Sequence, residues 1–335
     1  MTLDFTESTY PSHTPDTPAR TSAENTLLSG HDPEPFIIKP GNSPIVIMGP
    51  HNGSAVPRKL YYCDKPLGID ADLFDSASSN ARHDLVDINV EKFLWRALQS
   101  HEILQHAHFI EATYSRAVVD PNRSPEHARA IITQTSGTTS STHGVIQIPG
   151  NKNLSQFEIN QRMQTIYDAY HDALADLILS VREEYGYVIL LDIHSFTPEL
   201  DGQKRAVEFG PLNVDNNPHA LELERFARRD NSYVTRNGKP FDLRPGMPDN
   251  GKTAALSIIE RTGAHYAGLE FRNDKIANIE GGQRAANFTG RFVTHLQPEL
   301  ILPKHYRAQS TRISNTPTPE PKASSSLPHA AFQGV

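Results

Sequence analysis

The sequence contains a single cysteine, Cys63, among its 335 residues. One cysteine forms no internal disulfide and excludes CxxC zinc ribbons and cysteine-ligated clusters. No stretch approaches the roughly 18 consecutive apolar residues of a membrane span, and the N-terminus MTLDFTESTYPSH lacks the basic and apolar regions of a secretory signal. We therefore expect a cytoplasmic protein from a reducing compartment that does not enter a membrane.

Positive charge is also scarce. Lysine and arginine number 32 against 39 acidic residues, so the formal net charge is -7, and no basic run offsets that balance. This composition argues against a nucleic-acid partner. Neither GxGxxG nor GxxxxGK[ST] occurs, which disfavours a nucleotide-binding enzyme.

Hydrophobic residues make up 37% of the chain, which is enough to build a core. Residues 1–36 and 306–335 are rich in Thr, Ser and Pro with little hydrophobic periodicity, and we expect both to be disordered tails. No repeat divides the stretch between them, so we expect one domain over residues 37–305. The oligomeric state does not follow from the sequence.

Apolar runs of strand length alternate with helical patterns, which favours an α/β sheet covered by helices. The clearest helix begins at Ser155, which forms a capping box with Glu158, and Gly186 is expected to end it. The predicted strands are Pro44–Gly49, His108–Thr113, Tyr187–Ile193, Ala206–Gly210 and Tyr266–Phe271.

Polar side chains stand where several of these strands end. His51 follows PIVIMG, Asp192 and His194 stand in LLDIHSFTP, and Glu270 ends YAGLEF. Open α/β sheets bind ligands outside the carboxyl ends of their strands, so we expect these groups to converge at one sheet edge. The alternative is that Asp192 and His194 are polar residues hydrogen-bonded at a strand end.

Two histidines with carboxylates nearby suit a divalent metal such as zinc. The spacing of His51 and His194 is no signature in itself, and no HExxH motif occurs among the sixteen histidines. The pair is therefore compatible either with a metal site or with chance. We expect His171 to be a solvent-facing or structural histidine, and Tyr167 and Tyr170 to lie in the core of the long helix.

The segments PHNGSAVP, SRAVVDPNR, DIHSFTP and GLEFRND, taken in this order, resemble the N-formylglutamate amidohydrolase family, which is distantly similar to zinc carboxypeptidases and aspartoacylases. The likeness covers about residues 40–300, including DINVEKFL and YDAYHDAL. It implies a hydrolase of the zinc-carboxypeptidase-like (phosphorylase/hydrolase-like) α/β fold, with a mixed sheet flanked by helices.

On the matching positions, the resemblance makes His51 and His194 metal ligands and Glu270 the general base. Asn122 and Arg123 would hold a substrate carboxylate. Carboxypeptidases supply a further ligand from His-x-x-Glu, but Ser54 occupies that place here. We expect Asp87 as the replacement ligand, and Arg272 as a further substrate-binding residue.

Each assignment has a structural alternative. Asp87 could instead cap the helix that begins near Val90. Arg123 could form a surface ion pair, and Arg116 could either bind substrate or pair with Asp120. Glu270 could be a hydrogen-bonded strand-end carboxylate, while Asp192 is expected to orient His194.

The implied reaction removes a small acyl group from an acidic N-acyl amino acid, such as N-formyl-L-glutamate, giving formate and L-glutamate. Zinc would activate water, and Glu270 would accept its proton. The alternatives are a deacylase or carboxypeptidase-like hydrolase of another N-acyl amino acid or peptide, and a catalytically inactive binding protein of the same fold.

Overall fold

The computed structural model describes residues 33–55, 60–62, 65–67, 90–125, 134–136, 145–147, 151, 154–196, 198–200, 203–204, 206–212, 218–235 and 254–301. The chain divides into two compact units, residues 1–292 and residues 293–335. The sheet and the candidate site belong to the first unit. Of the second unit, the structure describes the end of the last helix.

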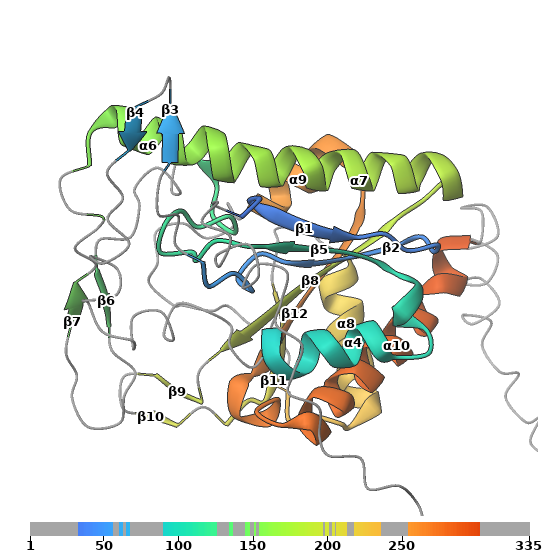
Figure 1. The fold of residues 1–335 in the computed structure, drawn as a ribbon. Coiled ribbons are helices and arrows are strands. Elements are labelled where there is room, and N and C mark those ends of the chain that lie inside the picture. Colours follow the sequence, from blue (N-terminus) through green and yellow to red (C-terminus); the bar gives the residue numbers. More distant parts are fainter. Residues whose placement is uncertain are drawn as a thin grey trace, which may run out of the picture. The chain divides into compact units, whose positions relative to one another are not determined.

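The helices and strands alternate along the chain as the sequence predicts (Figure 1). In chain order the elements are β1 (Phe36–Lys39), β2 (Ile45–Gly49), β3 (Leu60–Tyr62), β4 (Lys65–Leu67), the π-helix η1 (Val90–Trp95), α4 (Arg96–Ser100), the 3-10 helix η2 (Leu104–His106), β5 (His108–Ala112), β6 (Gln134–Ser136), β7 (Val145–Gln147), α6 (Gln156–Arg162), the π-helix η4 (Met163–Asp168), α7 (Ala169–Tyr185), β8 (Ile189–Phe196), β9 (Glu199–Leu200), β10 (Gln203–Lys204), β11 (Phe209–Leu212), α8 (Pro218–Asp230), α9 (Ala254–Thr262), β12 (His265–Arg272), the 3-10 helix η5 (Asn273–Lys275) and α10 (Ile279–Ile301).

The main sheet has six strands in the order β1-β5-β2-β8-β12-β11. The four inner strands are parallel, and the edge strands β1 and β11 run antiparallel to their neighbours. The predicted α/β class with a mixed sheet flanked by helices is therefore confirmed. All five predicted strands are present, with ends shifted by a few residues.

Strand β1 was not predicted from the sequence. Phe36 pairs with Ala112 and Lys39 with Phe109, so the strand crosses the expected boundary between tail and domain. Its four residues, FIIK, are too few to show a period of two. Most of the expected tails fall outside the described residues, and the division at 37 and 305 stays a prediction.

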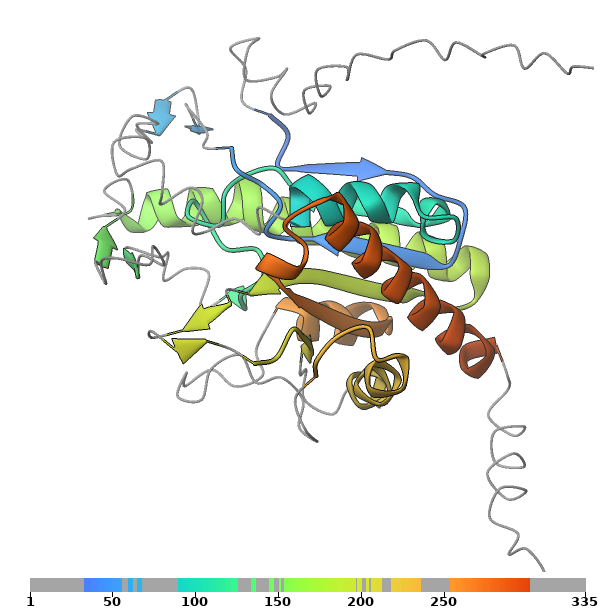
Figure 2. The ribbon, with the colours of Figure 1, turned by 90° about the horizontal axis from the view of Figure 1, so that it is seen from below.

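One face of the sheet packs against α7 and α9 (Figures 1 and 2). Strand side chains alternate between faces, so every second residue of each inner strand joins this layer. The contact includes Val46, Ile110, Leu190 and Tyr266 from the strands, and Leu174, Ile178 and Ile258 from the helices. Asp192 shares this face because it stands two residues after Leu190.

The opposite face carries η1, α4, α8 and the first part of α10 (Figure 2). Aromatic side chains fill this layer. Trp95 packs edge-on against Phe109, with ring centroids 5.2 Å apart. Phe209 lies 5.0 Å from Phe271 and 4.7 Å from Phe288 between ring centroids. The sheet is thus buried on both faces, as a mainly parallel sheet requires.

The predicted long helix forms, and its ends are those expected. Ser155 and Glu158 make the reciprocal capping box, and Gly186 ends the helix with a φ of 77° in the left-handed region. The helix is not uniform, because the π-helical segment η4 separates α6 from α7. A π-turn leaves no mark in hydrophobic periodicity, so the sequence did not indicate it.

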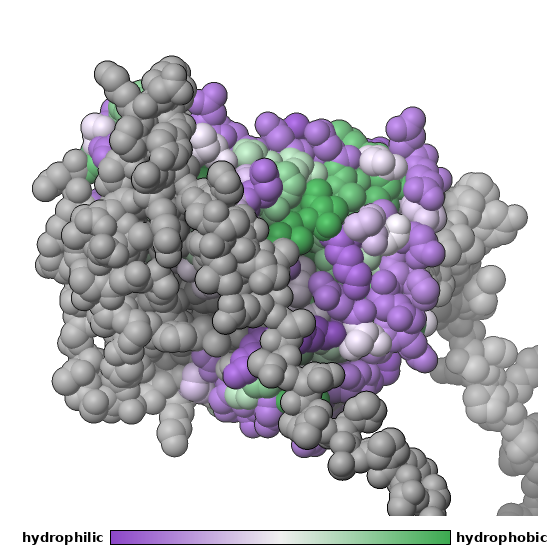
Figure 3. Space-filling model, in the orientation of Figure 1, coloured by the Kyte–Doolittle hydropathy of each residue, from purple (hydrophilic) through white to green (hydrophobic). Residues whose placement is uncertain are grey.

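Among the residues described, none of the helices combines the length and apolar character that crossing a membrane requires. The face in Figure 3 is mostly hydrophilic where it is coloured, apart from an apolar area beside α7 and over the edge strand β1. Ile38 of β1 is 37% exposed and is followed by Lys39. A charged residue on an edge strand discourages pairing with another chain.

Candidate active site at the carboxyl ends of the central strands

Three central strands bring their polar residues to one edge of the sheet. In the parallel ladder Glu270 of β12 pairs with His194 of β8, while Met48 of β2 pairs with Asp192. His51 lies two residues beyond the end of β2. The convergence that the strand ends predicted is therefore present.

The rings of His51 and His194 lie against each other. Their centroids are 4.8 Å apart and their planes are inclined by 65°. Both residues are almost completely buried, with exposed fractions of 4% and 2%. We call His51 and His194 the histidine pair. Glu270, also buried, occupies the neighbouring ladder position to His194.

Asp120 holds His51 from one side. His51 Nε2 donates to Asp120 Oδ1 at 2.9 Å, and the backbone N–H of Asn122 donates to the same oxygen at 3.0 Å. The other oxygen lies 2.5 Å from Arg116 Nη2 and 3.3 Å from Arg123 Nε. Burial alone would raise the pKa of Asp120, but Arg116, His51 and Arg123 together hold it well below its usual value.

Asp192 lies beside His194, although the two side chains do not meet in hydrogen-bond geometry. His194 Nε2 lies 2.8 Å from Asp192 Oδ1, and the Tyr266 hydroxyl donates to Asp192 Oδ2 at 2.8 Å. Burial, and then the charge of Asp192, raise the pKa of Tyr266 well above its usual value. Gly268 leaves the necessary space, since a Cβ there would lie 2.6 Å from the Tyr266 hydroxyl. The expected role of Asp192 as an orienting partner of His194 stays a prediction.

The turn after β2 is shaped by Asn52 and two glycines. Asn52 Nδ2 donates to Glu111 Oε2 at 3.2 Å, which anchors the turn to β5. A Cβ on Gly49 would lie 2.5 Å from Asn52 Nδ2, and one on Gly53 would lie 2.4 Å from the backbone of Thr113. The two glycines therefore permit the close approach that carries His51 into the site.

Two arginines border the histidine pair. Arg116 Nη1 lies 3.4 Å from His51 Nδ1, and Arg116 also makes the ion pair with Asp120 that the sequence left open. The side chains of Arg116 and Arg123 are 23% and 30% exposed. Because both side chains are partly exposed, both can meet an anion arriving from solvent.

Arg272 is the last residue of β12, and its backbone N–H donates to the carbonyl of Glu208. Its guanidinium is 2.7 Å from Asp274 and 3.6 Å from Glu208. This acidic surrounding gives no support to its predicted contact with substrate, which stays a prediction. Asp87, the predicted third metal ligand, lies outside the described residues.

Within the described part of the chain, no group of three or more His, Cys, Asp or Glu side chains is arranged to hold a metal ion. The histidine pair nevertheless has one feature of metal-binding histidines. Each ring has a buried carboxylate at Nε2, and such a carboxylate fixes the ring and directs its other nitrogen toward a cation.

Sequence reasoning assigned no site role to Asp120, although it bonds to His51 and to both arginines. The available signal was the placement of Asp120 four residues after Arg116 and directly before Pro121, Asn122 and Arg123. An aspartate two residues before a backbone N–H commonly accepts from it, and this fixes such a turn.

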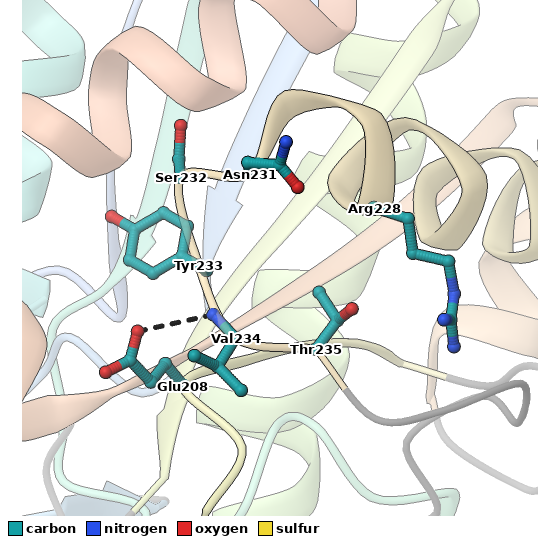
Figure 4. Close-up of a pocket in the computed structure, with 7 residues that line it drawn as sticks. All are labelled: Glu208, Arg228, Asn231, Ser232, Tyr233, Val234 and Thr235. Atoms are coloured by element: carbon teal, nitrogen blue, oxygen red, sulfur yellow. Dashed lines mark hydrogen bonds between the residues drawn. The ribbon is translucent and has the colours of Figure 1, made fainter.

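A separate pocket of about 420 Å³ opens beside the end of α8 (Figure 4). Its lining consists of Glu208, Arg228, Asn231, Ser232, Tyr233, Val234 and Thr235. The charged members already pair within the protein, Arg228 with Glu224 at 2.8 Å and Glu208 with Lys275 at 2.7 Å. None of the candidate site residues lines this pocket, and we assign it no role in the reaction.

Comparison with known proteins agrees with the geometry of the strand ends. A gene product of Agrobacterium tumefaciens has a similar structure, with 24% identity and a TM-score of 0.63 over 80% of this chain and 96% of that one. An N-formylglutamate amidohydrolase from Ralstonia eutropha JMP134 is 18% identical, with a TM-score of 0.52 over 80% of this chain and all of that one. At these identities the two structures show a shared fold.

None of the curated proteins compared with the chain matches it. The profile of the N-formylglutamate amidohydrolase family, however, matches residues 43–277. This span contains His51, Asp120, His194 and Glu270, and it covers most of the chain. The chain is therefore an amidohydrolase and belongs to the N-formylglutamate amidohydrolase family.

Proposed function

We propose that the protein hydrolyses N-formyl-L-glutamate to formate and L-glutamate in a metal-dependent reaction, and that it does so in the cytoplasm. The observation that carries this proposal is the buried histidine pair, with Glu270 beside it and two arginines at its border. Amide hydrolysis needs an activated water, a proton acceptor and a means of holding the substrate.

The charges around Asp120 favour an acidic substrate. Arg116 and Arg123 contribute two positive charges, and Asp120 cancels one of them. The remaining positive charge would bind one substrate carboxylate, which a guanidinium can contact through two N–H groups. Asn122 Oδ1 has no hydrogen-bond partner within the described residues and offers an acceptor for the amide N–H of the substrate.

Glu270 is suited to act as general base. It is 4% exposed and stands next to His194 in the ladder, on the sheet face that also carries Asp192. In the proposed reaction its carboxylate accepts a proton from the attacking water and then delivers it to the leaving amine nitrogen. The C–N bond of the formamide breaks, and formate and the free amine of glutamate result.

We propose that a zinc ion would bind at the histidine pair. His51 and His194 would hold it, because each ring has a buried carboxylate within 2.9 Å of Nε2. A zinc ion held there would supply Lewis-acid chemistry and would lower the pKa of water from about 15.7 to about 7. Asp87 remains the proposed third ligand.

A substrate series tests this proposal. Purified protein with added zinc is assayed for amine release from N-formyl-L-glutamate, N-formyl-L-glutamine, N-acetyl-L-glutamate and a formylated dipeptide. We expect N-formyl-L-glutamate to give the highest kcat/KM. A preference for acetyl or peptide substrates would replace the proposal with the related deacylase or peptidase activity, and no turnover of any of them would favour a binding protein.

A further inference from the structure

A row of buried side chains on the long helix binds the backbone of the loop that carries Asp120. We call residues 115–124 (SRAVVDPNRS) the Asp120 loop. Tyr167 donates its hydroxyl to the carbonyl of Arg123 at 2.7 Å, and His171 Nε2 donates to the carbonyl of Pro121 at 2.8 Å. These carbonyls flank Asn122, which lies beside the carboxylate that holds His51.

The same helix also binds the first half of the loop. Arg162 Nη1 donates to the carbonyl of Val118 at 3.0 Å and to Asn151 Oδ1 at 2.6 Å. Asn151 Nδ2 in turn donates to the carbonyl of Ala117 at 2.6 Å. Four carbonyls of one loop are thus bound by side chains that lie outside it, and Arg162 is only 1% exposed.

The π-helical segment η4 explains how one helix presents this row. Arg162 and Tyr167 are five residues apart, and in an ordinary α-helix of 3.6 residues per turn they would point in different directions. In a π-helix hydrogen bonds join residues five apart, so such residues lie nearly above one another. His171 follows four residues after Tyr167, and its ring lies 4.3 Å from the Tyr167 ring.

We propose that Arg162, Tyr167 and His171 are positioning residues that set the height and tilt of the Asp120 loop, and thereby place Arg123 for the substrate carboxylate and Asp120 for His51. The part of this inference that concerns substrate rests on the proposed function. The positioning residues bind backbone carbonyls of the loop, so they leave the side chains of Asp120 and Arg123 for the site.

The protonation states of His171 and Arg162 suit them to donate hydrogen bonds to the carbonyls of the Asp120 loop. Burial lowers the pKa of His171 to about 4, and that of Arg162 to about 10. At neutral pH His171 is uncharged, and its contact with a carbonyl places the hydrogen on Nε2. Arg162 keeps its charge, so its bonds to two oxygens are charge-assisted and strong.

Substitutions of the phenol and of the imidazole test the proposal. Tyr167→Phe deletes only the hydroxyl that binds the loop. Tyr170→Phe is the matched control, because Tyr170 is on the same helix, is 1% exposed, and has a hydroxyl with no hydrogen bond among the described residues. His171→Leu removes the donor to Pro121, whereas His171→Gln keeps a donor near the Nε2 position.

The first measurement is hydrogen exchange of the backbone amides in the Asp120 loop. We expect Tyr167→Phe and His171→Leu to speed exchange about fivefold at Val118, Asn122 and Arg123, which is the factor expected from losing one hydrogen bond. Tyr170→Phe and His171→Gln should stay near wild type. Unchanged exchange in Tyr167→Phe would overturn the proposal, and Tyr167→Phe and His171→Gln decide it even if His171→Leu does not fold.

The second measurement separates positioning from general stability. With N-formyl-L-glutamate, Tyr167→Phe should raise KM about threefold to tenfold with a smaller change in kcat. When Tyr167→Phe is added to Arg123→Ala, the KM should be the same as for Arg123→Ala alone. Independent, multiplying effects on KM would contradict the role through Arg123. If wild-type protein does not turn over this substrate, the proposed function fails, and hydrogen exchange alone decides the positioning role.

Discussion

The rings of His51 and His194 are in edge-to-face contact, with centroids 4.8 Å apart, although His51 follows β2 and His194 lies in β8. Each has a buried carboxylate at Nε2, Asp120 for His51 and Asp192 for His194. Burying two carboxylates beside two imidazoles has a large desolvation cost unless neighbouring groups compensate their charges. We therefore propose this edge of the sheet as the place where the chemistry occurs.

Metal content should depend on both histidines. If the pair holds zinc, purified protein will contain about one zinc per chain, and His51→Asn or His194→Asn will each lower that content at least tenfold. Elemental analysis after dialysis measures it. His106→Asn, a change of an exposed histidine, should leave zinc in place. Full amidase activity in protein freed of metal would contradict metal dependence.

Glu270→Gln should abolish proton transfer while preserving the fold. The amide keeps the size of the side chain but cannot accept a proton from water, so kcat should fall roughly 100-fold or more. Zinc content and the melting temperature should change little. Glu280→Gln, an exposed residue on α10, provides the matched control. A turnover rate close to wild type would remove Glu270 as the base.

Arg123→Ala should act mainly on substrate binding. Loss of the guanidinium removes a charged hydrogen bond to a substrate carboxylate, and KM for N-formyl-L-glutamate should rise at least tenfold. Steady-state kinetics measure this. Arg261→Ala, which breaks an exposed ion pair with Asp172, should leave KM unchanged. The carboxylate role would be refuted by an Arg123→Ala protein with the wild-type KM.

The positions of the site strands were predictable because buried parallel strands are continuous apolar runs and their polar ends stand out. His51, His194 and Glu270 each follow or end such a run, and the ladder brings them to one edge. Asp120 was harder to predict because it lies in a loop, where no periodicity fixes which way a side chain points. Its function depends on how Arg116 and Asn122 fold around it.

The positions of Tyr167 and His171 show a second limit. Both were expected to be structural or core residues, and both are buried. Their contacts with the Asp120 loop depend on the π-helical segment between Arg162 and Ala169. The spacing of hydrophobic residues in the sequence does not reveal such a segment. A helical wheel drawn at 3.6 residues per turn places Arg162 and Tyr167 on different faces.

Gly268→Ala should disturb the hydrogen bond from Tyr266 to Asp192, the carboxylate beside His194. A Cβ at residue 268 would lie 2.5 Å from Leu212 Cβ and 2.6 Å from the Tyr266 hydroxyl, so the strand or the phenol must move. We expect a loss of about 1–3 kcal/mol in the free energy of unfolding and reduced kcat. Tyr266→Phe removes the hydrogen bond to Asp192 without the clash and should cost less stability. Equal stability of Gly268→Ala and wild type would contradict this packing.

The pH dependence of stability should contain a contribution from His171. Its pKa is about 4 in the folded protein, against 6.5 for the free side chain. Between these values the unfolded chain binds a proton that the folded protein excludes. The free energy of unfolding therefore rises as pH rises through this window and falls as pH falls through it. The contribution of His171 over the whole window is about 3 kcal/mol.

His171→Gln removes this titration and keeps a donor to the carbonyl of Pro121. Denaturant unfolding at pH 7 and at pH 4.5 should show that the variant loses about 2 kcal/mol less than wild type over that interval. His106→Asn changes an exposed histidine and should follow the wild-type curve. Parallel curves for His171→Gln and wild type would mean that His171 is protonated in the folded protein, and its place between Tyr167 and Pro121 would then have to hold a buried charge.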